Sequence, residues 1–438
     1  MISKLKKLRQ HHGFMRYFEN ISWLMSEKFL RMFIGLFVGI WVARYLGPEQ
    51  FGLLSYAQSF VFLFIAISTL GLDSIVVREL VKDESKRDVL LGTAFGLKLV
   101  GAILILPILA MAVQLTSNDD YTNSLIFITA SLTIFQSFNV IDFYYQSKVL
   151  SKYVALANAI SLAISSIIKI ALILGNAPLV AFALITVFDV AVVSVGLIYF
   201  YKKNSQLKLF NWRFEWKMAK KLLQYSWPLI LSGLVISLYM RIDQVMIKEI
   251  LDADAVGQYA AAVRLSTAWY FIPLAIATSF FPAIINAKKI SEELYFSRLQ
   301  RLYSLMIFLA IAIALPVTFL SDWVILLLYG SEYSQAGEVL MIHIWAGIFV
   351  FLGVAWSKWI LNENKQNLVL ISHILGAVIN VGLNLYFIDK YGVVGAAYST
   401  IISYFLSQII GFSLYKAKLT YALIFWTKDI FGNKKMDE

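Results

Sequence analysis

The chain has 438 residues, of which 60% are hydrophobic and 15% charged, and its mean hydropathy is +0.73. A soluble domain would carry about a quarter of its residues as charges, so this composition excludes a soluble globular protein. The sequence contains no cysteine, which excludes disulfides, thiolate metal sites and thiol catalysis. The formal net charge is +11, but the basic residues lie in alternate connections between apolar segments, which is typical of membrane topology rather than nucleic-acid binding.

Apolar runs long enough to cross a bilayer, which needs about 20 residues, recur along the whole chain. We predict an all-α polytopic membrane protein with about twelve transmembrane helices. Their expected ranges are 22–43, 51–72, 89–113, 123–143, 154–174, 178–200, 224–246, 256–283, 302–320, 336–358, 367–388 and 393–415. The first run is full length and lacks the features of a cleaved signal peptide, so we expect it to remain as a helix.

The basic residues define the expected orientation. Lys and Arg gather in both tails and in every second connection, whereas the remaining connections hold only Arg44, Lys248 and Lys390. Cytoplasmic loops carry the excess of Lys and Arg in membrane proteins. We therefore expect both termini to be cytoplasmic.

An internal repeat indicates the domain organisation. LGPEQFG at Leu46–Gly52 and LDADAVG at Leu251–Gly257 each end one predicted helix and open the next, at an offset of 205 residues. Internal repeats build many transporters, with substrate held between the halves. We predict an N-terminal six-helix lobe at 1–200, a basic cytoplasmic linker at 201–223, and a C-terminal six-helix lobe with its cytoplasmic tail at 224–438.

Ionisable residues within the predicted spans suggest the substrate. Each costs roughly 2.5–3.5 kcal/mol near the middle of a helix, so such residues usually face a cavity, a partner charge or a ligand. The deep cations are Arg31, Lys98, Lys169, Arg241 and Arg264, and the deep acids are Asp189 and Asp243. A cavity with surplus cations favours an anionic ligand, and the planar fork of arginine suits pyrophosphate. Interhelical salt bridges and snorkelling remain the structural alternative for each charge.

Other kinds of chemistry lack support in the sequence. We find no Walker A motif and no cluster with metal-ligand spacing, so we predict neither a nucleotide, a metal nor another cofactor. The predicted outer connections are short. A membrane-embedded glycan polymerase or ligase usually needs a larger outer loop, so we predict that the protein is not an enzyme.

Several stretches resemble one transporter family. ENISWLMSEKFLRM, VARYLGPEQFGLLSYAQS and LGLDSIVVRELVK in the first third, with YMRIDQVMI at 239–247 and VGQYAAAVRLS at 256–266, resemble the polysaccharide-biosynthesis flippases, which include the O-antigen flippases. These belong to the multidrug/oligosaccharidyl-lipid/polysaccharide exporter superfamily. The resemblance covers essentially the whole chain.

The resemblance implies two lobes around a central V-shaped cavity. It also implies alternating access that moves undecaprenyl-pyrophosphate-linked oligosaccharide repeat units from the inner to the outer leaflet of the bacterial cytoplasmic membrane, for O-antigen, capsule or exopolysaccharide synthesis. The expected partners are the lipid-linked oligosaccharide, membrane lipids, and a polysaccharide polymerase and chain-length regulator. A cation-coupled multidrug or small-solute exporter of the same superfamily is the alternative.

The resemblance also suggests site residues. Arg31, Arg241 and Arg264 stand on helices that match the family and would hold the pyrophosphate, and we add Lys98 because of its predicted depth. Coupling to a proton or sodium gradient would use Asp189 and Asp243, which otherwise form charge pairs with cations on other helices.

Overall fold

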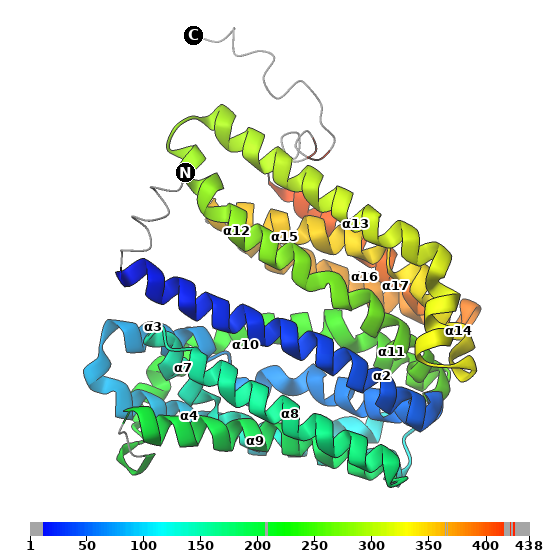
Figure 1. Cartoon of the computed structure of the whole chain (residues 1–438), viewed down its shortest axis with the longest axis horizontal. Helices are drawn as coiled ribbons and strands as arrows, with labels where there is room; N and C mark the ends of the chain where they lie inside the picture. Colours follow the sequence, from blue (N-terminus) through cyan, green and yellow to red (C-terminus); the bar gives the residue numbers. More distant parts are fainter. Residues whose placement is uncertain are drawn as a thin grey trace. The chain divides into compact units, whose positions relative to one another are not determined.

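The computed structural model of the chain (Figure 1) describes residues 12–205, 209–363, 365, 367–415, 421 and 424. Every regular element of these residues is a helix. Ten described helices are long and apolar enough to span a membrane, or eleven if the bent pair Ser331–His343 and Ala346–Asn362 forms one span. The prediction of an all-α polytopic membrane protein is therefore confirmed, while the count of twelve spans stays a prediction.

The helices follow one another with short connections. In chain order they are α2 (His12–Thr69), α3 (Asp73–Lys82), α4 (Arg87–Ala112), α5 (Asp120–Ala130), α6 (Leu132–Gln136), α7 (Val140–Ser147), α8 (Lys152–Leu174), α9 (Leu179–Ser205), α10 (Trp216–Ile250), α11 (Ala253–Thr267), α12 (Phe271–Lys288), α13 (Glu292–Leu328), α14 (Ser334–His343), α15 (Ala346–Asn362), α16 (Asn367–Tyr391) and α17 (Val393–Leu414). Short 3₁₀ turns join several of them, including Ser137–Asn139 and Ala268–Tyr270.

The chain forms two compact units. The first comprises Met1–Leu46 and Leu53–Ser237, and the second comprises Gly47–Gly52 and Leu238–Glu438. The change from the first unit to the second lies inside α10. The predicted lobe limits at residues 200 and 224 stay a prediction.

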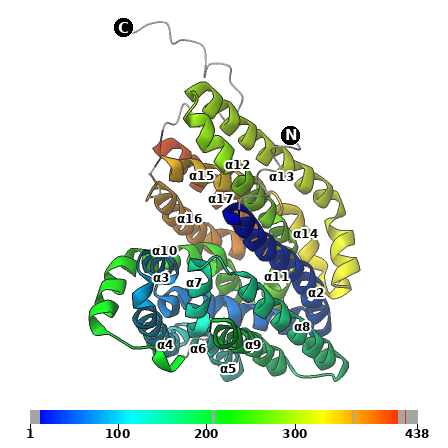
Figure 2. The same ribbon diagram turned by 60° about the vertical axis from the view of Figure 1, so that its left-hand side comes forward.

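The first unit is built around α3, α4, α7 and α9, and α8 lies alongside α9 (Figures 1 and 2). Its core includes fully buried apolar side chains such as Leu72, Val76 and Tyr145. The predicted helix at 123–143 is broken into α5, α6 and α7. The hydroxyls of Ser131 and Thr133 donate to the carbonyls of residues 128 and 130, and such bonds back to the preceding turn bend helices.

The second unit pairs α16 with α17, α11 with α14, and α13 with both α14 and α15. The indoles of Trp356 and Trp359 and the ring of Tyr303 are buried in its core. Helices α14 and α15 are bent by 44° relative to each other. Hydrogen bonds join α10, α11, α16 and α17 in one buried polar cluster, which is described below.

The long helix α2 is interrupted at Gly47, whose φ of 71° and ψ of 168° are not helical. A positive φ of this size is strained for residues with a β-carbon, so glycine is needed here. Pro48 follows and has no backbone N–H to continue the helical hydrogen bonding. The LGPEQFG motif thus separates two helical stretches, as its composition predicts.

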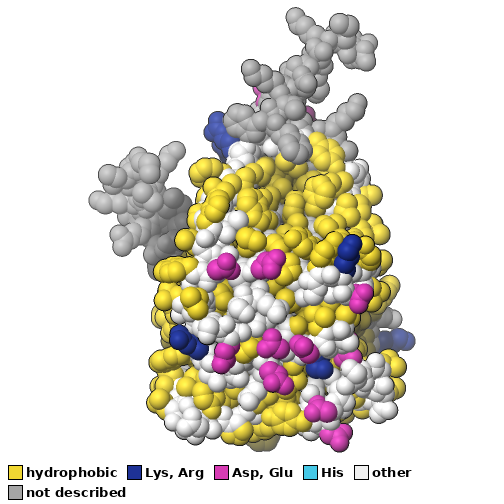
Figure 3. Space-filling view, turned by 90° about the vertical axis from the view of Figure 1, so that its right-hand side faces the viewer, with side chains coloured by type: hydrophobic (Ala, Val, Ile, Leu, Met, Phe, Trp, Pro, Cys, Tyr) yellow, Lys and Arg dark blue, Asp and Glu magenta, His cyan; other side chains and the backbone are white. Residues whose placement is uncertain are grey.

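One face of the surface carries more acidic than basic side chains. Figure 3 shows one face on which Asp and Glu side chains gather among hydrophobic and uncharged ones, while Lys and Arg are few.

Candidate functional site

Asp243 on α10 is a buried carboxylate held by neutral donors from three other helices. The Asn384 amide of α16 donates to Oδ1 at 2.6 Å, and the Tyr259 hydroxyl of α11 and the Thr400 hydroxyl of α17 each lie 2.9 Å from Oδ2. The residue is 6% exposed. A buried charge needs such compensation, because removal from water is costly. Asp243 therefore organises the four-helix contact.

The polar cluster continues along α16 and α17. The Asn384 amide also donates to Asn380 Oδ1 at 3.2 Å, and the Asn380 amide lies 3.4 Å from the hydroxyl of Ser403. Both asparagines are fully buried. The side-chain oxygen of Asn384 accepts no hydrogen bond from the described residues. A carboxylate, two amide oxygens and a hydroxyl are thus gathered in one buried place.

Cations do not neutralise Asp243 directly. Within the part of the chain that the structure describes, no Lys, Arg or His nitrogen lies within 4.0 Å of its carboxylate. The same described residues contain no group of three or more His, Cys, Asp and Glu side chains arranged to hold a metal ion. The cluster is one acid among neutral oxygen groups, which differs from a transition-metal site.

Arg241 and Arg264 lie in the same unit as this cluster. Arg241 precedes Asp243 by two positions on α10, so the two side chains leave the helix in different directions. The guanidinium of Arg264 on α11 lies 5.6 Å above the ring of Phe51. Arg241 and Arg264 stand on the consecutive helices α10 and α11. The structure therefore places two of the predicted substrate-binding cations on consecutive helices of the second unit.

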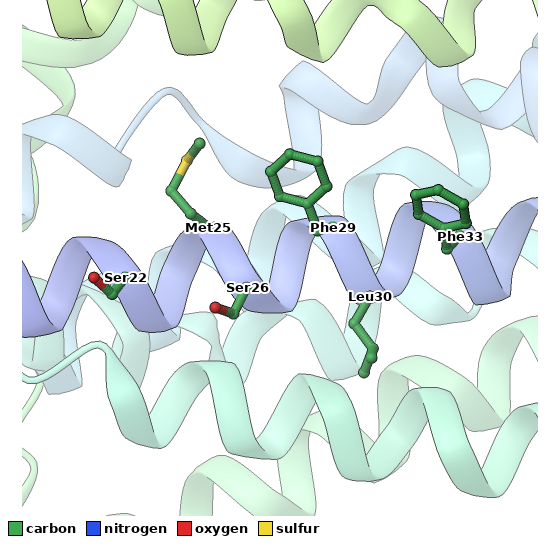
Figure 4. A pocket seen from close by; sticks show the side chains of 6 residues that line it. All are labelled: Ser22, Met25, Ser26, Phe29, Leu30 and Phe33. Atoms are coloured by element: carbon green, nitrogen blue, oxygen red, sulfur yellow. The ribbon is translucent and has the colours of Figure 1, made fainter.

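Arg31 lies in the first unit, on α2. Its Nε donates to Glu27 Oε1 at 2.7 Å, one turn earlier on the same helix, and its side chain is 42% exposed. The same stretch of α2 lines a largely apolar groove of about 690 Å³ (Figure 4). Its lining residues are Ser22, Met25, Ser26, Phe29, Leu30 and Phe33. Arg31 thus has one carboxylate partner, Glu27, and its side chain is partly exposed.

Lys98 and Asp189 also lie in the first unit, each with a local partner. Lys98 Nζ on α4 is buried, 3.5 Å from Asp73 Oδ1 and 4.9 Å from the centre of the Phe143 ring. The Asp189 carboxylate on α9 accepts a hydrogen bond from Ser161 on α8. In the described residues no hydrogen bond or ion pair joins Arg31, Lys98 and Asp189 to one another.

The sequence predicted Asp243 but not the groups that hold it. Asn380 and Asn384 are four residues apart on α16, and Thr400 and Ser403 are three apart on α17, so each pair shares one helix face. Amides at this spacing within apolar spans are a signal that could have found them. A second buried link joins Ser266 Oγ to His343 Nδ1 at 2.8 Å.

Comparisons with known proteins identify relatives of this chain. Residues 17–288 match the model of the polysaccharide biosynthesis protein family, and residues 228–386 match the MatE model. The chain is 24% identical to the probable low-salt glycan biosynthesis flippase Agl15 of Haloferax volcanii and 25% identical to a putative O-antigen transporter of Shigella flexneri. These matches cover 48% and 50% of this chain but 46% and 52% of those two relatives, about half of their length.

A longer match joins the chain to the capsular polysaccharide biosynthesis protein CapF of Staphylococcus aureus, with 22% identity over 91% of this chain and 99% of the relative. Among solved structures, an inward-facing multidrug resistance MATE family transporter matches with a TM-score of 0.73 over 90% of this chain and 95% of that one. Lipid II flippase MurJ in an inward closed conformation matches with a TM-score of 0.69, over 92% of this chain and 90% of that one. Both are 17% identical to this chain, so they show a shared fold.

Proposed function

Because the chain belongs to the polysaccharide biosynthesis protein family, we propose that it is a flippase for undecaprenyl-pyrophosphate-linked oligosaccharide repeat units. It would move them from the inner to the outer leaflet of the bacterial cytoplasmic membrane by alternating access, for O-antigen, capsule or exopolysaccharide synthesis. Both termini would be cytoplasmic. A polysaccharide polymerase would consume the product, together with a chain-length regulator.

The placement of Arg241 and Arg264 on consecutive helices of the second unit carries the proposal. Both arginines lie in apolar helices of one unit, and the acid of that region, Asp243, is bound by neutral donors. A cation within a membrane span usually faces a cavity, a partner or a ligand. A pyrophosphate would be such a ligand, and two guanidinium forks can donate parallel hydrogen bonds to its oxygens.

Arg31 and Lys98 would contribute from the first unit. Arg31 belongs to the stretch of α2 whose other residues line the apolar groove, and this combination suits an amphiphile whose charged head and lipid tail need different surroundings. Lys98 is buried on α4 with Asp73 as its acidic partner. A buried lysine with one exposed carboxylate can exchange that partner for a phosphate without leaving a charge unpaired.

Transport would be coupled to a proton or sodium gradient at Asp243. An ionisable residue inside a membrane span commonly marks an ion pathway. A sodium ion, which is a small hard cation, would find several oxygen ligands here: the carboxylate of Asp243, the side-chain oxygen of Asn384 and the hydroxyl of Thr400. A proton would need the carboxylate alone. Asp189, bonded to Ser161, is the second candidate in the first unit.

A cation-coupled multidrug or small-solute exporter is the second candidate, because residues 228–386 match the MatE model. A drug cation would bind best where acids outnumber bases. The arginine pair and the neutral donors around Asp243 therefore favour the lipid-linked anion over a cationic drug.

The leaflet distribution of lipid-linked oligosaccharide in cells that lack this protein tests the proposal. We expect accumulation on the cytoplasmic face together with loss of surface glycan, and restoration of both by the wild-type chain. Normal surface glycan without accumulation, in cells with no redundant flippase, would exclude the flippase and favour the exporter.

A further inference from the structure

The start of α10 carries a groove that the proposed transport mechanism does not use. Its volume is about 440 Å³, and it lies wholly within the first unit. The lining residues are Leu97 of α4 and, from α10, Trp216, Ala219, Lys220, Leu223, Gln224 and Trp227. The two tryptophans are 80% and 58% exposed and stand about 16 Å apart along the helix at 1.5 Å per residue.

The groove has fixed walls because the segment before α10 is bonded to α4. The backbone N–H of Arg213 donates to the carbonyl of Asp88 at 3.1 Å, and that of Glu215 donates to Thr93 Oγ1 at 3.1 Å. A β-carbon on Gly92 would lie 2.5 Å from the Arg213 nitrogen, so the two backbones are in close contact. Trp216 follows directly and is therefore held at one end of the groove.

The lysines at this end of α10 differ in whether they form ion pairs. Lys221 Nζ lies 3.0 Å from Glu79 Oε2, and Glu79 also binds Arg78 and Lys82. Lys217 and Lys220 are exposed, and in the described part of the chain no carboxylate lies within 4.0 Å of either ammonium. Glu215 is exposed as well and forms no ion pair with them among the described residues.

We propose that this groove binds an anionic phospholipid, with one acyl chain along Leu97 and Leu223 and the phosphate between Lys217 and Lys220. Exposed tryptophan is typical of the membrane interface, where its ring lies at the level of the head groups. Basic groups close to apolar surface at the cytoplasmic side attract anionic lipids. A zwitterionic lipid would leave the two ammonium groups without net counter-charge. Leu97 precedes Lys98 of the proposed transport site on α4, and the competition experiment below distinguishes the two ligands.

Lipid binding to the purified full-length chain tests this inference. Native mass spectrometry or lipid-dependent thermal shifts would compare phosphatidylglycerol with phosphatidylethanolamine of the same acyl chains. We expect saturable binding of phosphatidylglycerol at least tenfold tighter than that of phosphatidylethanolamine. The double variant Lys217→Gln/Lys220→Gln should remove most of that preference.

The matched control is Lys202→Gln/Lys289→Gln, which removes two exposed lysines that form no ion pair among the described residues. This control should bind like wild type. Equal affinity for the two lipids, or an unchanged preference in Lys217→Gln/Lys220→Gln, would overturn the inference.

Two further readouts keep the test decisive. If the double variant does not fold, wild-type binding of phosphatidylglycerol should still weaken several-fold between low and high salt, and salt-independent binding would contradict the inference. A polyprenyl pyrophosphate added as competitor should leave phosphatidylglycerol bound. Its displacement at equal concentration would assign the groove to the transport substrate instead.

Discussion

Gly52 and Gly257 lie against each other in a reciprocal backbone contact. A β-carbon on Gly52 would lie 1.7 Å from the carbonyl oxygen of Ala253, and one on Gly257 would lie 2.0 Å from the carbonyl oxygen of Pro48. Both pairs of equivalent positions are 205 residues apart, which is the offset of the sequence repeat. The two repeat motifs therefore contact each other through the same positions, and the contact tolerates only glycine.

Gly52→Ala and Gly257→Ala are each expected to destabilise the protein. A methyl group would meet backbone atoms that cannot rotate away, and overpacking typically costs about 1–3 kcal/mol. Thermal unfolding in detergent, followed by fluorescence-detected size exclusion, measures the effect. Gly382→Ala is the control, since a β-carbon there meets nothing within 4 Å. Equal melting temperatures for all three variants would contradict the described contact.

Arg241→Ala and Arg264→Ala should each abolish most of the transport while leaving expression and insertion intact. A hydrogen bond to a charged group contributes roughly 1.5–3 kcal/mol, which corresponds to a loss of about one to two orders of magnitude in rate. Arg→Lys at either position should retain partial activity, because the charge survives without the planar fork. Lys289→Ala, an exposed lysine, serves as control. Full transport by both alanine variants would exclude the pyrophosphate clamp.

Asp243→Asn should uncouple transport from the ion gradient. The change keeps the size of the side chain but removes its charge, and its new amide would face the donating amide of Asn384. Transport would be followed in vesicles with an imposed sodium gradient at constant pH, and separately with a pH gradient in sodium-free buffer. The gradient that no longer accelerates the variant identifies the coupled ion. If each gradient accelerates transport by the variant as much as it accelerates transport by the wild type, Asp243 has no part in coupling.

Two variants distinguish a role of Lys98 in substrate binding from a purely structural ion pair with Asp73. Asp73→Asn leaves Lys98 buried without its carboxylate, whereas Asp73→Asn/Lys98→Met removes both charges. We expect the double variant to regain wild-type thermal stability but to transport poorly, because the cation is missing. If the double variant transports at the wild-type rate, Lys98 does not bind substrate and serves only as an ion-pair partner of Asp73.

The sequence was most informative about the helices and the buried charges. Long apolar runs predict spans because every backbone polar group in lipid needs a partner within its own helix. The acid at Asp243 stands out for the same reason, since a charge in an apolar run is costly. These features depend on local sequence alone, and the fold confirmed the spans as helical.

The partners of each charge could not be predicted, because they come from distant segments. Asn384 and Thr400 lie 141 and 157 residues from Asp243. Their spacing from Asn380 and Ser403 indicates a polar face on each helix, but it does not show which charge on another helix that face contacts. The break between Ala130 and Val140 could not be predicted either, because it depends on hydrogen bonds from side-chain hydroxyls to particular backbone carbonyls.

Transport by the purified chain in proteoliposomes tests the central claim most directly. Undecaprenyl-pyrophosphate-linked oligosaccharide placed in one leaflet would be followed by the access of a glycan-modifying enzyme added outside. We predict that wild-type protein moves the labelled lipid across the bilayer and that Arg241→Ala/Arg264→Ala protein, inserted to the same level, does so no faster than empty liposomes. Equal movement with wild-type protein and with empty liposomes, in the presence of sodium and proton gradients, would contradict the account.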